Sequence, residues 1–334
     1  MPKQLLPIAN KPMSQYCIEV LRDAGIKEIA IIIGGNNSHK VQEYYGDGTI
    51  FDVKLTYIFQ DQPKGISHAI SLCQEFIQNE KFIVFLGDNI LKMDISEFKE
   101  NFEKSNSDAT ILLCEVDNPK QFGIADIEGN TIKKIIEKPK NPPSNLAVIG
   151  IYFLSPIIFD VIKKLKPSWR NELEITDALQ ILLVENGKIH YEIVTDFWKD
   201  TGTPNDILDA NRVILEDMAP YFHGIVKDDV KQNGNVMVGK NSILYDAVEI
   251  IGPVLMGKNC RIHGNSSIGP NVSIGDNCDI FNTNIDNSIV MSNTKIEKNK
   301  KISNSIIAFN SQILSKDNEN TEYLLGEDSK ILNK

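Results

Sequence analysis

Large apolar residues recur at every sixth position in the C-terminal third of the chain. The eight positions of this series are Val238, Leu244, Ile250, Met256, Ile262, Ile268, Ile274 and Ile280. Hexapeptide periodicity is typical of a parallel β-helix, in which each hexad forms one face of a triangular coil. The register shifts after Ile280 and resumes near Val290. The pattern therefore predicts a β-helix over residues 235–314, followed by a polar tail over 315–334.

Two cysteines of this segment, Cys260 and Cys278, are three hexads apart and should stack on successive coils. Adjacent strands lie about 4.8 Å apart, which is within the Cα range that permits a disulfide. In a reducing compartment the same residues act as small inward-facing fillers with free thiols. We favour the second interpretation.

The first 220 residues show a different pattern, in which short apolar runs alternate with segments of helical spacing. The predicted strands are residues 29–33, 53–59, 82–86, 111–116, 123–128, 132–137, 148–154 and 191–195, and the longer predicted helices are 13–24, 66–77, 174–184 and 205–218. This alternation is typical of an α/β domain with a mostly parallel, Rossmann-like sheet covered by helices on both faces. The domain prediction is an α/β domain over residues 1–220 and a linker over 221–234.

Composition narrows the class of protein. The formal net charge is −10 and the sequence pI is about 5.1, with no basic stripe, so a nucleic-acid polymer is not an expected partner. No apolar run approaches the ~20 residues that a membrane span needs. Five scattered cysteines without a Cys-x-x-Cys motif indicate a reduced, cytoplasmic protein. β-Helices of this kind pack flank to flank, so a homo-oligomer is expected.

The stretch Phe82 to Asn89 stands out within the α/β pattern. Five bulky apolar residues without a polar break predict a strand buried on both faces, and Gly87 and Asp88 follow it. Ligands of open α/β sheets bind in the crevice at the carboxyl ends of the strands. Asp88 is therefore well placed to bind a ligand or a metal ion. A turn or a helix cap is the alternative role of Asp88 and Asn89.

Four further clusters contain side chains that suit the same chemistry. They are Lys3 in a proline-flanked loop, Gln60 with Gly65, Glu137 with Lys138, and Trp198 with Asp200. Two aspartates at strand ends could share Mg²⁺, a hard cation that prefers oxygen ligands. Lysines 3 and 138 could neutralise phosphates, Glu137 could accept hydrogen bonds from sugar hydroxyls, and the amide of Gln60 could read a base edge.

No nucleophile with an adjacent base accompanies these clusters. Ser67 and His68 are sequence neighbours on a predicted helix, so their side chains do not face each other. Positioning and charge neutralisation without a covalent intermediate suit phosphoryl or nucleotidyl transfer.

Six segments in this order resemble the sugar-1-phosphate nucleotidyltransferases, most closely the long form of glucose-1-phosphate thymidylyltransferase. The segments are residues 2–13, 60–69, 86–89, 137–139, 167–177 and 198–203. The resemblance implies a left-handed β-helix at the C-terminus and the reaction of dTTP with glucose 1-phosphate. It also implies roles for individual residues: Lys3 at phosphate, Gln60 and Gly65 at the base, Asp88 and Asp200 at Mg²⁺, and Gly123, Glu137, Lys138 and Val148 at the sugar phosphate, with Trp198 beside the substrate.

The chain departs from the family pattern at its start. The family opens with a buried strand and a loop of the form Gly-Gly-x-Gly-Thr-Arg before Pro-Lys, whereas here Met1 directly precedes Pro2 and Lys3. We therefore expect two unpaired sheet edges, very low transferase activity and reduced stability in the chain as printed. An upstream start codon is the explanation that we favour.

Three alternatives remain open. One is a UTP- or GTP-using enzyme, or one acting on another sugar phosphate, because Gln60 does not separate thymine from uracil. Another is an additional acyltransferase activity on the β-helix, where His263 is the histidine available. The third is a catalytically impaired regulatory or assembly subunit.

Overall fold

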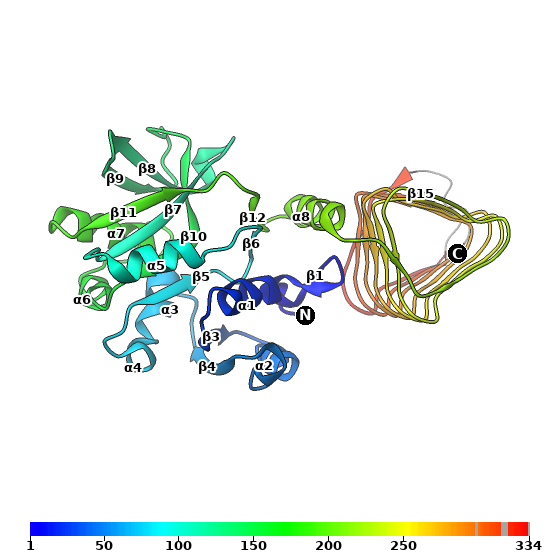
Figure 1. Ribbon diagram of the computed structural model, residues 1–334, viewed down its shortest axis with the longest axis horizontal. Coiled ribbons are helices and arrows are strands. Elements are labelled where there is room, and N and C mark those ends of the chain that lie inside the picture. The colour runs from blue at the N-terminus through cyan, green and yellow to red at the C-terminus, as the bar shows by residue number, and fades with distance from the viewer. Residues whose placement is uncertain (298–299, 315–319, 333–334) are drawn as a thin grey trace. The chain divides into compact units, whose positions relative to one another are not determined.

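The computed structural model describes residues 1–297, 300–314 and 320–332 (Figure 1). The chain divides into two compact units. Pro2–Gln4 and Ser14–Asp200 form the first, here named the α/β unit, whereas Met1, Leu5–Met13 and the chain from Thr201 onward form the second, here named the solenoid unit. The short segment Leu5–Met13 thus belongs with the C-terminal part of the chain, although the sequence pattern assigns it to the N-terminal domain.

The main sheet of the α/β unit has six strands in the order β11-β7-β10-β8-β9, with β5 also paired to β10. These strands are β5 (Phe82–Phe85), β7 (Ala109–Glu115), β8 (Gly123–Glu128), β9 (Thr131–Glu137), β10 (Leu146–Leu154) and β11 (Ile189–Ile193). Strand β11 runs parallel to β7, whereas β10 runs antiparallel to all three of its neighbours. The α/β class is confirmed, and the sheet is more mixed than the strand–helix alternation predicted.

Helices cover both faces of this sheet, as Figure 1 shows. The helices of the unit are α1 (Met13–Asp23), α2 (His39–Tyr45), α3 (Ile66–Ser71), α4 (Gln74–Ile77), α5 (Ser96–Lys104), α6 (Ile157–Ile162) and α7 (Ile175–Val184). Alternate residues of β10 explain the two layers, because successive strand side chains point to opposite faces. Val148, Tyr152 and Leu154 pack in one core cluster with α6 and α7, whereas Phe153 meets Phe102 of α5.

The predicted helix over residues 66–77 is divided in the structure. Helix α3 ends at Ser71 and α4 begins at Gln74, because Leu72 and Cys73 turn the chain between them. Strands β8 and β9 form the predicted hairpin, and Gly129 takes a positive φ of 60° in its turn. Glycine reaches this left-handed conformation without the steric cost that a side chain imposes.

The prediction that residues 82–86 are buried on both faces is wrong. All four residues of β5 are only partly buried. Within the described residues β5 pairs with β10 alone, and the parallel strands β3 (Glu28–Gly34) and β4 (Lys54–Gln60) form a sheet of their own. One edge of β5 is therefore not covered by another strand, and the predicted unpaired sheet edges are found on β5 and on the β3–β4 pair.

The solenoid unit contains three parallel ladders, one for each side of a triangular coil (Figure 1). The first is β13 (Tyr221–Phe222), β16 (Val236–Val238), β19 (Val254–Met256), β22 (Val272–Ile274), β25 (Ile289–Val290), β28 (Ile306–Ile307) and β31 (Leu324–Leu325). The second is β14 (Ile225–Val226), β17 (Ile243–Leu244), β20 (Arg261–Ile262), β23 (Asp279–Ile280), β26 (Lys295–Ile296), β29 (Gln312–Ile313) and β32 (Lys330–Ile331). The third is β15 (Lys231–Asn233), β18 (Glu249–Ile251), β21 (Ser267–Ile268), β24 (Thr283–Asp286), β27 (Lys300–Ser303) and β30 (Asn320–Thr321).

Hexapeptide periodicity explains the solenoid core. All eight residues of the apolar series are fully buried and belong to one core cluster. Strand partners in the first coils are three hexads apart, as in Val236 and Val254, whereas Ser273 pairs with Ile289 two residues earlier than that spacing requires. The parallel solenoid is confirmed, and the shortened coil accounts for the register shift after Ile280.

The solenoid ladders extend beyond residues 235–314 at both ends. Strands β13, β14 and β15 lie in the segment expected to be a linker, and β30, β31 and β32 lie in the segment expected to be a polar tail. Neither segment carries the complete hexapeptide series, which is why the pattern did not include them. Residues 315–319 and 333–334 of the expected tail lie outside the described residues.

Two short elements complete the solenoid unit. The hairpin of β1 (Pro7–Ile8) and β2 (Lys11–Pro12) and helix α8 (Pro204–Asp217) pack beside the solenoid. The Oδ1 atom of buried Asn211 on α8 accepts hydrogen bonds from the Ala9 backbone and from the Ser273 hydroxyl, each at 2.9 Å. Cys260 and Cys278 are buried free thiols, as the filler interpretation expected. None of the described helices is long and apolar enough to cross a membrane.

Candidate functional site

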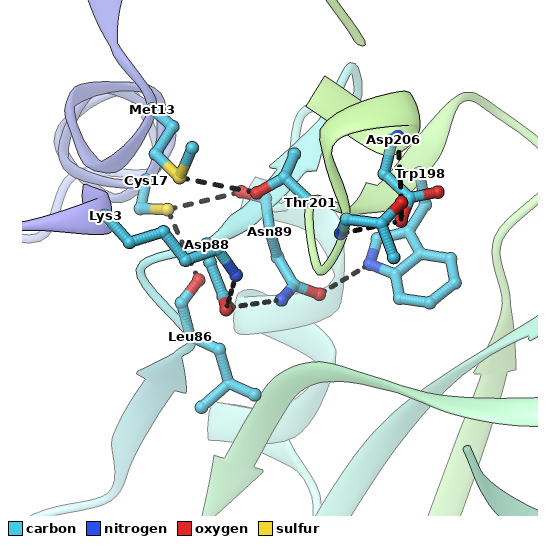
Figure 2. Close-up of polar contacts among 10 residues, drawn as sticks. Lys3, Met13, Cys17, Leu86, Asp88, Asn89, Trp198, Thr201 and Asp206 are labelled. Carbon is cyan, nitrogen blue, oxygen red and sulfur yellow. Dashed lines mark hydrogen bonds and ion pairs between the residues drawn. The ribbon is translucent and has the colours of Figure 1, made fainter. Parts of the chain in front are cut away.

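Asp88 lies in the loop between β5 and β6 (Asn89–Leu91), and Lys3 lies in a 3₁₀ helix, Lys3–Leu5. The Lys3 Nζ atom is 2.8 Å from Asp88 Oδ2, although the residues are 85 positions apart (Figure 2). Each side chain is about one-third exposed, so solvent reaches the ion pair and screens it. The ion pair therefore holds the Lys3 ammonium group beside the Asp88 carboxylate, and it contributes little to the net stability of the fold.

Asn89 connects this carboxylate to a second part of the site. Its Nδ2 atom donates to Asp88 Oδ1 at 3.1 Å, and its Oδ1 atom accepts from Trp198 Nε1 at 2.7 Å (Figure 2). Asn89 is 2% exposed, so both amide atoms use protein partners where water is scarce. Strand β12 (Trp198–Asp200) runs antiparallel to β6 and sets Asp200 directly opposite Asn89. Asp200 thus lies opposite the residue that follows Asp88 in the chain.

Glu137, at the end of β9, is a partly buried carboxylate with two polar partners on other elements. Its Oε2 atom accepts a hydrogen bond from the Thr176 hydroxyl at 2.8 Å, and its Oε1 atom lies 3.6 Å from Arg170. Burial raises the pKa of Glu137 above its ordinary value, and the nearby Glu174 carboxylate adds to this, while Thr176, Lys138 and Arg170 oppose it. The carboxylate is thus held in place at an energetic cost.

Gly123 pairs with Glu137 across the β8–β9 hairpin. A Cβ atom at position 123 would overlap the Thr176 side chain, so only glycine leaves that side chain its place against Glu137. The Lys138 backbone N–H donates to the Phe122 carbonyl at 3.0 Å, and the Phe122 ring packs edge-on against Trp198 at 5.6 Å. These contacts join the Glu137 cluster to the Asp88–Asn89–Trp198 cluster. Val148, by contrast, is 6% exposed and packs in the core.

Gln60 and Gly65 flank a loop that leads from β4 to α3. Gly65 has a φ of 96°, and a Cβ atom there would lie 2.6 Å from the Leu173 carbonyl oxygen, so the position requires glycine. The Gln60 Nε2 atom lies 2.8 Å from His68 Nδ1. The proposed base-reading amide is thus held by a histidine of the following helix.

The donor set at Asp88 and Asp200 suits a divalent cation of the hard, oxygen-preferring kind. The Lys3 ammonium group already lies against this carboxylate, at 2.8 Å. Within residues 1–297, 300–314 and 320–332 no group of three or more histidine, cysteine, aspartate or glutamate side chains forms a metal cage. Two carboxylates with substrate phosphates are the usual protein environment of Mg²⁺.

The structure adds four residues to the candidates named from the sequence: Asn89, Thr176, Arg170 and His68. All four lie within the segments that resemble the family. Three of them have a partner far away in the chain, because Asn89 bonds Trp198, and Thr176 and Arg170 contact Glu137. The sequence indicates these roles only through the residue types, because a partner far away in the chain produces no pattern in the local sequence. His68 lies eight positions from Gln60, and the helical spacing of Ser67 and His68 gives no sign of this contact.

The fold and the clustered strand-end residues define a nucleotidyltransferase. The sequence model of the nucleotidyl transferase family matches residues 1–217, and that of the GMPPB C-terminal domain matches residues 250–334. The chain belongs to the sugar-1-phosphate nucleotidyltransferases with a C-terminal β-solenoid, and it is an enzyme of nucleotide-sugar biosynthesis. Its substrates are a sugar 1-phosphate and a nucleoside triphosphate.

Three relatives illustrate this membership. The low-salt glycan biosynthesis nucleotidyltransferase Agl11 of Haloferax volcanii is 43% identical over 99% of this chain and 94% of its own length. A glucose-1-phosphate thymidylyltransferase of Streptomyces griseus is 36% identical over 71% of this chain and 66% of its own. A solved structure described as a glucose-1-phosphate thymidylyltransferase of Bacillus anthracis has a TM-score of 0.61 and 38% identity, covering 66% of this chain and 89% of that one.

Proposed function

We propose that this enzyme transfers a thymidylyl group from dTTP to glucose 1-phosphate, giving dTDP-glucose and pyrophosphate. The observation that carries the proposal is the continuous chain of contacts from Lys3 through Asp88, Asn89 and Trp198 to Phe122, beside Glu137. This chain of contacts links the groups that we assign to phosphate, to the cation and to the sugar hydroxyls, and it spans the two-stranded β6–β12 sheet and the six-stranded sheet of the α/β unit. The named thymidylyltransferase relatives support the choice of nucleotide and sugar.

The reaction needs no covalent enzyme intermediate. A phosphate oxygen of glucose 1-phosphate attacks the α-phosphorus of dTTP, and the bond from this phosphorus to the bridging oxygen of the β-phosphate breaks, so pyrophosphate leaves. Charge accumulates on the phosphoryl oxygens, and fixed cations stabilise it. Lys3 and Lys138 are the cations that we assign to this task, with Lys3 held in position by Asp88.

Glu137 is assigned to the sugar. Ionised Glu137 has acceptor capacity beyond the hydrogen bond from Thr176, and it can bind sugar hydroxyl groups. The backbone of Gly123, directly opposite Glu137, allows close approach of the sugar because it lacks a side chain. Asp88 and Asp200 would hold Mg²⁺, which neutralises phosphate charge when it is bound.

Release of pyrophosphate tests the proposal. The enzyme is assayed with dTTP, UTP, CTP, GTP and ATP in combination with glucose 1-phosphate, galactose 1-phosphate, mannose 1-phosphate and N-acetylglucosamine 1-phosphate. The highest kcat/KM is expected for dTTP with glucose 1-phosphate. A higher value for UTP, or for another sugar phosphate, would replace the substrate assignment and leave the sugar nucleotidyltransferase class intact. Isotope exchange between pyrophosphate and dTTP that does not require sugar phosphate would contradict direct transfer.

A further inference from the structure

The amide of Gln60 has two orientations, and they present opposite hydrogen-bonding patterns to a ligand. A glutamine side chain carries a carbonyl oxygen that accepts and an NH₂ group that donates, and a rotation of 180° exchanges them. Thymine and uracil present an N3–H donor next to the O4 acceptor. Cytosine presents an N3 acceptor next to an amino donor. An amide that reads one of these edges in one orientation reads the other after the rotation, so the orientation decides the base.

His68 is the hydrogen-bond partner of this amide. Its Nδ1 atom lies 2.8 Å from Gln60 Nε2, and among the described residues the Gln60 side chain has no other hydrogen-bond partner. In this orientation of the amide the Gln60 nitrogen donates and His68 accepts through Nδ1, which corresponds to the tautomer with the ring proton on Nε2. The oxygen of Gln60 and its second N–H remain available to a ligand.

The surroundings hold His68 in place. The preceding residue, Ser67, is fully buried: its hydroxyl donates to the Glu174 carbonyl at 3.0 Å, and its backbone N–H donates to the Leu173 carbonyl at 3.1 Å. The Ser71 hydroxyl donates to the His68 carbonyl at 2.7 Å. Helix α3 is therefore tied to the segment before α7, which fixes the backbone position from which the His68 imidazole reaches Gln60.

We propose that His68 is a specificity-determining residue, which locks the Gln60 amide in the orientation that reads the N3–H and O4 edge of thymine or uracil. The proposal rests on the proposed function, because it takes Gln60 as the residue that contacts the base. His68 acts through Gln60 and is a positioning residue. It therefore affects the choice among bases and leaves the sugar phosphate and the chemical step unchanged.

Two substitutions at position 68 separate the orientations. In His68→Glu the carboxylate only accepts hydrogen bonds, so it keeps the amide nitrogen of Gln60 directed toward residue 68. In His68→Lys the side chain only donates, so it attracts the Gln60 oxygen and rotates the amide. The experiment measures kcat/KM for dTTP and CTP with glucose 1-phosphate, together with Kd for each nucleotide by calorimetry, so that slow turnover does not limit the test. His190→Lys, at an exposed position of strand β11, controls for added charge.

The readout is the ratio of dTTP to CTP in each assay, because a general gain or loss of triphosphate affinity cancels in a ratio. His68→Glu and His190→Lys should stay within about threefold of the unmodified enzyme. His68→Lys should lower the ratio by about tenfold, the effect of one exchanged hydrogen bond of ordinary strength. KM for glucose 1-phosphate should not change in any variant, and thermal unfolding reports whether each variant is folded.

Equal dTTP-to-CTP ratios in folded His68→Glu and His68→Lys would overturn the role of His68. If the unmodified enzyme still prefers dTTP over CTP, the proposed function is upheld. A ratio near one in the unmodified enzyme would overturn both, since Gln60 would then not read a pyrimidine edge. Equal loss in both variants would also overturn the inference, because it would show that the ring is needed for packing and not for the direction of its hydrogen bond.

Discussion

The solenoid and the strand-end site differ in how many residues specify each structural feature. In the solenoid, a core position is occupied on successive inner coils by equivalent residues, as with Leu244, Ile262 and Ile280 on the second ladder. In the site, each contact is made once, between residues such as Lys3 and Asp88 or Asn89 and Trp198. Because the core residues repeat, the solenoid can be predicted from the sequence, and the loss of one core residue leaves its equivalents on the neighbouring coils. A contact made once produces no sequence pattern, and no other pair of residues can replace it.

Substitution of Asp88 should produce the largest effect. Asp88→Asn removes the carboxylate that faces Lys3 and that we assign to the cation, while it keeps the side-chain shape. We expect kcat/KM to fall by about 10²- to 10³-fold, the usual effect of removing one preorganised electrostatic group. Asp228→Asn, at an exposed position of the solenoid, is the matched control. More than one-tenth of the normal activity in Asp88→Asn would show that this contact has a substitute after all.

Substitution of Ile262 tests the tolerance of the repeating region. Ile262→Ala creates a cavity in the fully buried core, and the expected loss is about 2–5 kcal/mol in the free energy of unfolding. Val226 lies two coils earlier on the same ladder and is 42% exposed, so Val226→Ala should cost less than about 1 kcal/mol. Urea denaturation measures both.

Activity measured on the folded fraction sharpens this test. Because neighbouring coils supply equivalent core residues, kcat/KM of folded Ile262→Ala should stay within about threefold of normal. A far larger loss of activity, in a variant that remains folded, would mean that one coil has a role that its neighbours do not share.

The same contrast explains how much of the structure could be predicted. The apolar residue at every sixth position predicts the solenoid because burial repeats with the coil. The apolar run predicts the strand that precedes Asp88 but also predicts more burial than the strand has, because the run does not reveal that β5 pairs with β10 alone among the described residues. The contact between Gln60 and His68 was not found, since it depends on where a loop returns the chain. Local pattern predicts elements, and tertiary contacts decide which side chains meet.

Substitution of Trp198 should have an intermediate effect. Trp198→Phe removes the indole N–H and leaves the Oδ1 atom of buried Asn89 without its partner, while a ring remains for Phe122. Loss of one partner of a buried polar group costs about 1–3 kcal/mol in the free energy of unfolding. Asn89 would also hold Asp88 less firmly, so kcat should fall by about tenfold. Chemical denaturation and steady-state kinetics measure the two effects.

Trp169 provides the control for this substitution, because its side chain is 82% exposed. Trp169→Phe should change stability by less than about 0.5 kcal/mol. If Trp198→Phe proves as mild as Trp169→Phe, then the chain of contacts through Asn89 does not hold the site together.

Glu137 should show the smallest effect, as a dependence of stability on pH. Burial raises the pKa of Glu137 in the folded protein above its ordinary value of 4.5, so the folded state binds this proton more tightly than the unfolded state does. The contribution of Glu137 to stability is therefore fully present below pH 4.5 and is lost as the pH rises through the folded pKa. In Glu137→Gln the site has no proton to lose. The difference in the free energy of unfolding between the native enzyme and Glu137→Gln should accordingly shift against the native enzyme as the pH rises through that range, and remain constant above it. A difference that does not change with pH would show that Glu137 ionises in the folded protein as it does in the unfolded chain, and that the site holds this carboxylate without strain.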